Sequence, residues 1–199
     1  MAIFPKAVPV RKSWDTAIIV LLFVVFVLAS VTTDNFLTSL NISYIFSNTS
    51  EIMIIAFAML FMIILGEIDL SVASMLALSS CMLGWSYAQG APIWLAMIVC
   101  LAVGSLCGFI NGFLVTKLGL GSLAVTIGTL ALYRGIANGI IGENTVSEFP
   151  EFWTSFGFDT FGTTFMPKTL PMIIVFGIFF AFLLHRTPFG RRTLAIGQS

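Results

Sequence analysis

Two acidic side chains, Glu67 and Asp69, lie between long apolar runs in the stretch IILGEIDLSVASMLALSS. A carboxylate in such a place can cap a helix, bind a substrate or carry a proton. Residues two apart do not share a helical face, so a paired acid and base is not expected. Asp69 or Ser71 can instead cap the following helix, where a carboxylate also meets the positive end of the helix dipole. We therefore expect a capped turn made by Gly66, Glu67, Asp69 and Ser71, with coupling, gating, or substrate or proton binding as alternative roles.

A second polar set lies in the apolar stretch TIGTLALYRGIANG. Thr126, Thr129 and Tyr133 follow a spacing of i, i+3 and i+7, which places them on one stripe of a helix. Arg134 lies beside this stripe, and an arginine at mid-membrane costs roughly 2.5 to 3.5 kcal/mol on insertion scales. Two interpretations are open. The stripe lines a water-filled path, or Arg134 extends to the outer headgroups.

Motifs of soluble catalysis are missing from the sequence. It contains no G-x-x-x-x-G-K-[ST] phosphate loop, no H-E-x-x-H pair and no G-x-S-x-G elbow. Cys81, Cys100 and Cys107 lie in apolar runs without metal-ligand spacing, and His185 is the only histidine. We expect neither an enzyme nor a metal site, and no ATP hydrolysis by this chain alone.

The composition indicates the elements that must hold these polar residues. The 199 residues are 58% hydrophobic and only 9% charged, with a mean hydropathy of +1.05. These values lie far outside the range of soluble globular domains and indicate an integral membrane protein. The formal net charge is zero and no basic cluster occurs, so nucleic acid is not expected as a partner.

Apolar runs can be counted as membrane spans, because a bilayer core about 30 Å thick requires about 20 mostly apolar residues per helix. About six runs predict an all-α, polytopic membrane helix bundle. They cover roughly residues 16–31, 45–65, 71–87, 92–116, 123–141 and 169–185. The first run is short and ends in VLAS, so a secretory signal peptide is its alternative interpretation.

The orientation follows from Lys and Arg, which are enriched in cytoplasmic loops. A cytoplasmic N-terminus leaves Lys168 as the one basic loop residue outside. The basic residues then inside are Lys6, Arg11, Lys12, Lys117, Arg186, Arg191 and Arg192. Both termini are therefore expected in the cytoplasm, and the long external loop, residues 142–168, has room for a small helix or hairpin.

Several segments resemble one family in order and spacing. GEIDLSVASMLALSS resembles the Gly-Gly-Ile-Asp-Leu-Ser-Val-Gly-Ser stretch of the permease subunits of bacterial ABC importers for ribose, xylose, rhamnose and autoinducer-2. Residues 108–137 are similar to the family's Gly-x-x-Asn-Gly, Lys, and Thr-x-Gly-Thr with a following Arg-Gly. TPFGRRTLAIG resembles its cytoplasmic Gly-Arg and Ala-Ile-Gly segment. The sequence departs from the family at Glu67 and Ala73, where glycine is usual.

The resemblance implies the permease subunit of an ATP-driven importer in the bacterial inner membrane, carrying rhamnose or a related monosaccharide, ribose or autoinducer-2. Its implied partners are a separate ATP-binding subunit, a periplasmic sugar-binding protein and a second permease subunit, identical or different. ATP is then a cofactor of the partner subunit, and none is expected in this chain. The implied candidates for the substrate path are Asn111, Thr126, Thr129 and Arg134. Those for docking on the ATPase are Gly190, Arg191 and Arg192, in a cytoplasmic loop over residues 187–197.

The domain expected from this resemblance is a single transmembrane permease domain over residues 1–199. Family members continue past the Ala-Ile-Gly segment into further helices, so the chain is expected to be the N-terminal part of a permease. Two alternatives remain. One is a proton-coupled secondary transporter that uses Glu67 or Asp69, and the other is an inactive, truncated membrane fragment.

Overall fold

The computed structural model describes residues 12–142, 145–162 and 166–197, and within these ranges the chain forms eight α-helices and no strand. The helices are α1 (Lys12–Thr32), α2 (Ser39–Ile64), α3 (Val72–Ala88), α4 (Ile93–Thr116), α5 (Ser122–Ile141), α6 (Glu151–Phe158), α7 (Leu170–Arg186) and α8 (Pro188–Gly197). This architecture confirms the all-α membrane bundle. Lys6 and Arg11, two of the basic residues used for the orientation, lie outside the described residues.

Six helices of the described chain coincide with the six predicted spans, namely α1 to α5 and α7. By length and apolar composition, three of them can each cross a bilayer, and these are α2, α4 and α5. The pair α7 and α8 meets the same criterion together, although it is bent by 72° at the break between them. The apolar part of α1, Thr16–Thr32, and the apolar helix α3 are shorter, so their crossing of the bilayer stays a prediction.

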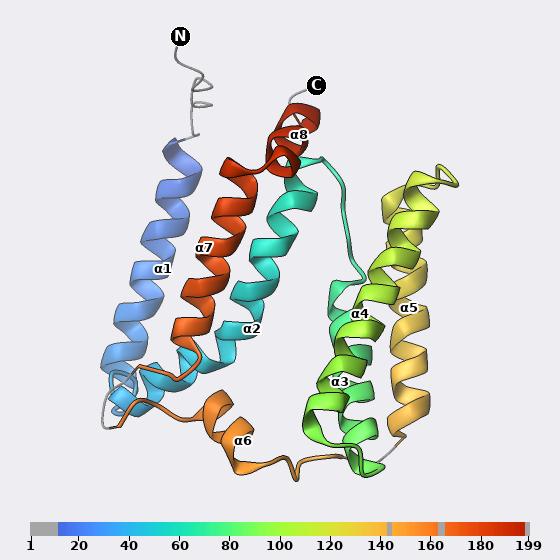
Figure 1. Cartoon of the computed structure of the whole chain (residues 1–199). Helices are drawn as coiled ribbons and strands as arrows, with labels where there is room; N and C mark the ends of the chain where they lie inside the picture. The colour runs from blue at the N-terminus through green and yellow to red at the C-terminus, as the bar shows by residue number, and fades with distance from the viewer. Residues whose placement is uncertain (1–11, 143–144, 163–165, 198–199) are drawn as a thin grey trace.

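The helices form two groups (Figure 1). On one side lie α1, α2, α7 and α8, and on the other lie α3, α4 and α5, with α6 near one end of the molecule. Aromatic rings join the first group, since Phe61 of α2 lies 6.0 Å from Phe180 of α7 and 5.7 Å from Phe189 of α8, measured between ring centroids. The second group packs around a core formed by Leu78, Cys107, Tyr133 and Ala137.

Small residues allow α3 and α4 to approach closely. A β-carbon added at Gly104 would lie 3.1 Å from the Ser79 hydroxyl oxygen, and one at Gly108 would lie 3.6 Å from the Met75 methyl carbon. Lipid provides little drive for helices to associate, so close backbone packing of this kind supplies much of the attraction.

The connection between α2 and α3 differs from the capped turn that the sequence predicted. Gly66 ends α2 at a positive φ of 74°, and the amides of Gly66 and Glu67 bond to the carbonyls of Ile63 and Met62 in a Schellman pattern. The irregular segment 65–71 then runs along the second group, and α3 begins only part-way along α4 (Figure 1). Ser71, at the end of this segment, is buried in the bundle, whereas Ile68 and Leu70 are exposed.

The long loop after α5 contains the helix α6, at the opposite end from α8 (Figure 1). Phe149 stacks on Tyr87 with ring centroids 5.3 Å apart, which holds the loop against the end of α3. Beyond α6, the Lys168 ammonium lies 3.2 Å from the Asp159 carboxylate. The Ser155 hydroxyl and Lys168 together lower the pKa of Asp159.

Candidate functional site

A series of hydrogen-bonded polar side chains, buried except for the half-buried Asp69, joins the segment 65–71 to α4 and α5. The Asp69 Oδ1 atom accepts hydrogen bonds from the Ser71 amide at 2.8 Å and from the Ser71 hydroxyl at 2.6 Å. Asn111 Nδ2 donates to the Ser71 Oγ atom at 2.7 Å. The Tyr133 hydroxyl lies 3.1 Å from both Asn111 Oδ1 and the Cys107 carbonyl oxygen, and donates toward them. We call Asp69, Ser71, Asn111 and Tyr133 the polar chain.

Most of the polar chain is buried, so its side chains need hydrogen-bond partners within the protein. Ser71 is 0% exposed, Tyr133 is 2% exposed and Asn111 is 6% exposed. Buried polar groups are costly unless they are hydrogen-bonded, and each group here has a partner. The arrangement therefore fixes the position of the segment 65–71 between two helices.

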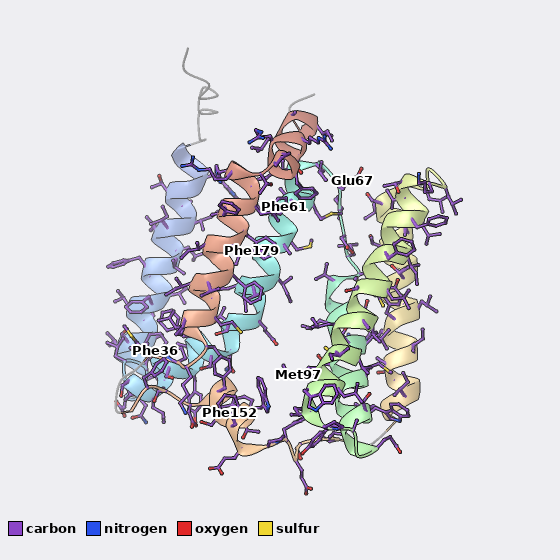
Figure 2. All side chains as sticks on the ribbon, viewed as in Figure 1. Phe36, Phe61, Glu67, Met97, Phe152 and Phe179 are labelled. Carbon is purple, nitrogen blue, oxygen red and sulfur yellow. The ribbon has the colours of Figure 1, made fainter. Side chains whose placement is uncertain are left out.

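The carboxylate of Asp69 does not cap α3 in the expected way. Ser71 occupies the N-cap position, but its side chain makes no capping hydrogen bond. Asp69 instead accepts from the amide of the N-cap residue itself, one position before the helix. Glu67 lies two residues before Asp69, toward the end of the molecule that carries α8 (Figure 2). The two acids are thus in different surroundings, and a proton or gating role for either stays a prediction.

The threonine stripe on α5 is buried, whereas Arg134 is not. Thr126 is 2% exposed, and its hydroxyl donates to the Ile68 carbonyl oxygen at 3.3 Å. Thr129 is 6% exposed, and its hydroxyl donates to the Val125 carbonyl oxygen at 3.0 Å. Arg134 is exposed on another face of α5. The stripe thus bonds to the backbone of α5 and of the segment 65–71. Its role as a path lining stays a prediction.

The stretch predicted as a cytoplasmic docking loop is helical. Thr187 ends α7, and its hydroxyl accepts a hydrogen bond from the Gly190 amide at 3.2 Å, as an N-cap side chain does. Pro188 takes the first position of α8, where a missing amide hydrogen costs nothing. The Thr-Pro pair is a sequence signal for this helix start. Residues 188–197 of the expected loop are therefore helical, and their cytoplasmic position and docking role stay predictions.

The three docking candidates on α8 differ in their exposure. Gly190 is buried, and a β-carbon there would overlap the carbonyl oxygens of Leu183 and Leu184. Arg191 and Arg192 are exposed. Gly190 therefore allows α8 to pack closely on the end of α7, and only the two arginines are available to a partner.

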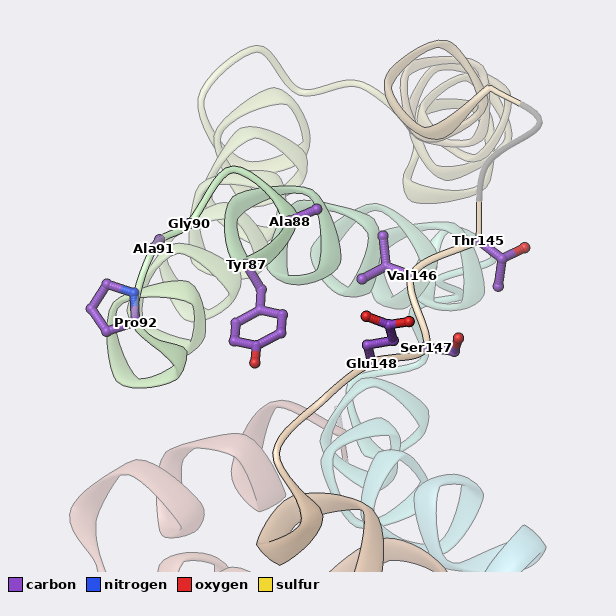
Figure 3. Close-up of a pocket in the computed structure, with 9 residues that line it drawn as sticks. All are labelled: Tyr87, Ala88, Gly90, Ala91, Pro92, Thr145, Val146, Ser147 and Glu148. Carbon is purple, nitrogen blue, oxygen red and sulfur yellow. The ribbon is translucent and has the colours of Figure 1, made fainter.

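Two larger cavities lie near the α6 end of the described chain. The first has a volume of about 710 Å³, and Figure 3 shows the Tyr87 ring and the Glu148 carboxylate at its edge. It lies where α3 ends, α4 begins and the loop after α5 passes over them. The second, of about 670 Å³, includes Glu51 of α2. Glu51 was missed by the sequence reasoning, although an acid within the predicted span 45–65 was a signal for it.

Comparisons with known proteins identify related permeases. The family model described as branched-chain amino acid transport system / permease component matches residues 41–199. The autoinducer 2 import system permease protein LsrD of Klebsiella pneumoniae is 33% identical over 198 residues, covering 95% of this chain and 58% of that protein. The ribose import permease protein RbsC of Bacillus subtilis is 35% identical over 180 residues, covering 88% of this chain and 55% of that protein. No solved structure matches. The chain thus spans somewhat more than half the length of these relatives.

Proposed function

Because the chain belongs to the family of branched-chain amino acid transport system permease components, we propose that it forms the membrane-spanning part of an ATP-driven importer. The family match over residues 41–199 carries this proposal. The named import functions of the relatives, ribose and autoinducer 2, support a small hydroxyl-rich substrate. Rhamnose or a related monosaccharide belongs to the same chemical class and is included in the proposal.

The proposed assembly places this chain in the bacterial inner membrane with three kinds of partner. These are an ATP-binding subunit, a periplasmic sugar-binding protein and a second permease subunit. The end of the molecule that carries α8 is assigned to the cytoplasm, because Arg186, Arg191 and Arg192 lie there and basic residues favour that side. In the assembly, α8 would contact the ATPase, while α6 and the loop after α5 would face the periplasm.

Asp69→Asn separates ATP-driven import from the proton-coupled alternative. The asparagine Oδ1 can accept both hydrogen bonds now made by Asp69, so we expect sugar uptake to be retained by cells that express the permease carrying this sequence with its partners. Asp69→Ala loses both bonds and is expected to destabilise the protein by about 1 kcal/mol. Uptake is measured with radiolabelled sugar, with ATP held constant and with or without a protonophore.

Three results would contradict the ATP-driven assignment. Uptake that stops with the protonophore alone would favour a secondary transporter. Loss of uptake in Asp69→Asn, at an unchanged protein level, would assign the proton to Asp69. Absence of uptake in the unsubstituted permease would favour the inactive fragment.

Charge reversal on α8 tests the contact with the ATPase. Arg191 and Arg192 are exposed, and replacing both by glutamate is expected to weaken co-purification of the ATP-binding subunit at least about tenfold, or about 1.4 kcal/mol. Lys117→Glu is the matched control. It also reverses a basic charge, but Lys117 lies at the C-cap position of α4 and is not part of α8. Equal ATPase recovery from the double variant and this control would remove the docking role from the two arginines.

A further inference from the structure

The cavity of about 670 Å³ lies between α2, α3, α6 and α7, and so between the two groups of helices. Its volume is within the range of about 300 to 1,000 Å³ that is typical of small-molecule sites. Its lining includes the polar residues Ser47, Asn48, Ser50, Glu51 and Thr169 and the apolar residue Phe158. A mixture of this kind combines hydrogen-bonding groups with apolar walls.

Glu51 is the acidic residue that lines the cavity, and its place in an apolar helix indicates a polar environment there. It lies near the midpoint of α2, a helix long and apolar enough to cross the bilayer. A carboxylate at that depth is costly in lipid, and such residues usually face a bundle interior or a water-filled space. Glu51 lines the cavity, whose volume is large enough to hold water beside the carboxylate.

Hydroxyl groups on the same wall provide a second, independent sign. The Ser50 and Thr169 hydroxyl oxygens lie 2.9 Å apart and connect α2 to the start of α7. The Ser47 hydroxyl oxygen is buried and lacks a hydrogen-bond partner among the described residues. An unsatisfied buried hydroxyl typically costs about 1 to 3 kcal/mol, and rotation about χ1 can redirect it toward a partner. A ligand with hydroxyl groups would supply that partner.

We infer that this cavity is a binding chamber for a neutral, hydroxyl-rich small molecule, at the α6 end of the membrane-spanning helices. The Glu51 carboxylate accepts hydrogen bonds from ligand hydroxyls, Asn48 and Ser47 donate or accept further ones, and Phe158 covers an apolar face of the ligand. An anion is disfavoured by Glu51, and a metal ion is disfavoured because the described residues contain no group of three His, Cys, Asp or Glu side chains that could hold one. The inference rests on the proposed function, since an importer needs a hydrated place for its cargo.

Thiol labelling tests whether water reaches the chamber. The chain is reconstituted in nanodiscs with Asn48→Cys, and a small charged methanethiosulfonate reagent is added. Asn48→Cys is expected to react well above the unsubstituted chain, which carries Cys81, Cys100 and Cys107. Thr49→Cys is the matched control, because Thr49 lies next to Asn48 on the same helix, at nearly the same depth, but does not line the cavity. Equal, low reactivity at both positions would overturn the inference.

Protection by sugar tests the ligand class. D-ribose and L-rhamnose are added separately, with betaine at equal osmolarity as the control for solute effects. At a sugar concentration about nine times its Kd, labelling of Asn48→Cys is expected to slow about tenfold, because only the unoccupied fraction reacts. Adding Glu51→Gln, which keeps the shape but removes the charge, is expected to raise the sugar concentration needed by about tenfold. A circular dichroism spectrum and Tm equal to those of Asn48→Cys alone show that this double variant is folded.

The outcomes separate the chamber from the importer. Protection by either sugar that depends on Glu51 supports the chamber, even if ATP-driven uptake is absent and the proposed function fails. Labelling that neither sugar slows overturns the chamber, even if uptake is driven by ATP. Protection that Glu51→Gln leaves unchanged removes the role given to the carboxylate and overturns the inference in the form stated.

Discussion

Gly190→Ala is expected to detach α8 from the end of α7. The added β-carbon would overlap the carbonyl oxygens of Leu183 and Leu184, which belong to the backbone of α7. A flexible side chain could turn aside, but these carbonyls are fixed by the helix that carries them. Overpacking costs typically about 1 to 3 kcal/mol, and the upper part of this range applies where the obstacle is backbone. The measurement is hydrogen exchange of the amides in residues 188–197, which should lose protection.

Gly135→Ala is the matched control for this substitution. Gly135 also lies in a helix, α5, but its β-carbon would meet nothing within 4 Å. Alanine is preferred over glycine in a helix by roughly 0.5 to 1 kcal/mol, so this variant should be neutral or slightly more stable. If Gly190→Ala kept the protection of α8 at the level of this control, the close packing assigned to Gly190 would be wrong. The variant should also lose the proposed ATPase contact, because Arg191 and Arg192 would no longer be held in place.

The long helices were predictable because the bilayer fixes both their length and their composition. The run at residues 92–116 predicted α4, which the structure gives as Ile93–Thr116. The helix α8 was not predicted, because it is short and polar and is held by a cap from Thr187 and by contact with α7. Its sequence signal was local, a Thr-Pro pair, and did not stand out beside the apolar runs.

The sequence singled out the residues of the polar chain but not the contacts between them. Ser71 and Asn111 are 40 residues apart, and spacing along the chain does not show that their side chains meet. The helical stripe placed Tyr133 correctly with the threonines, but it did not show that Arg134, one position later, turns outward. The point at which α3 begins could not be predicted either. Nothing in GEIDLS reveals that the segment 65–71 continues into the bundle before the helix begins.

Asn111→Ala is expected to destabilise the group formed by α3, α4 and α5. The Asn111 amide bridges the Ser71 hydroxyl and the Tyr133 hydroxyl, and both are buried. Its removal leaves Ser71 bonded to Asp69 and Tyr133 bonded to the Cys107 carbonyl, so each loses one of its partners. The expected loss is about 1 to 3 kcal/mol, which for a chain of this size lowers Tm by about 2 to 4 °C per kcal/mol. Thermal unfolding in detergent, followed by circular dichroism, measures this change.

Tyr133→Phe and the double variant show whether the residues act together. Tyr133→Phe removes only the hydroxyl and should cost about 1 kcal/mol. Once Asn111 is alanine, the Tyr133 hydroxyl has one hydrogen bond fewer to lose. The double variant should therefore lose less unfolding free energy than the two single variants together, as expected for residues in one network. Asn138→Ala, at an exposed asparagine of α5, should leave Tm unchanged and serves as the control. If Asn111→Ala were as stable as Asn138→Ala, the polar chain would not hold the segment 65–71 in place, and another contact, such as that of Thr126 with Ile68, would have to do so.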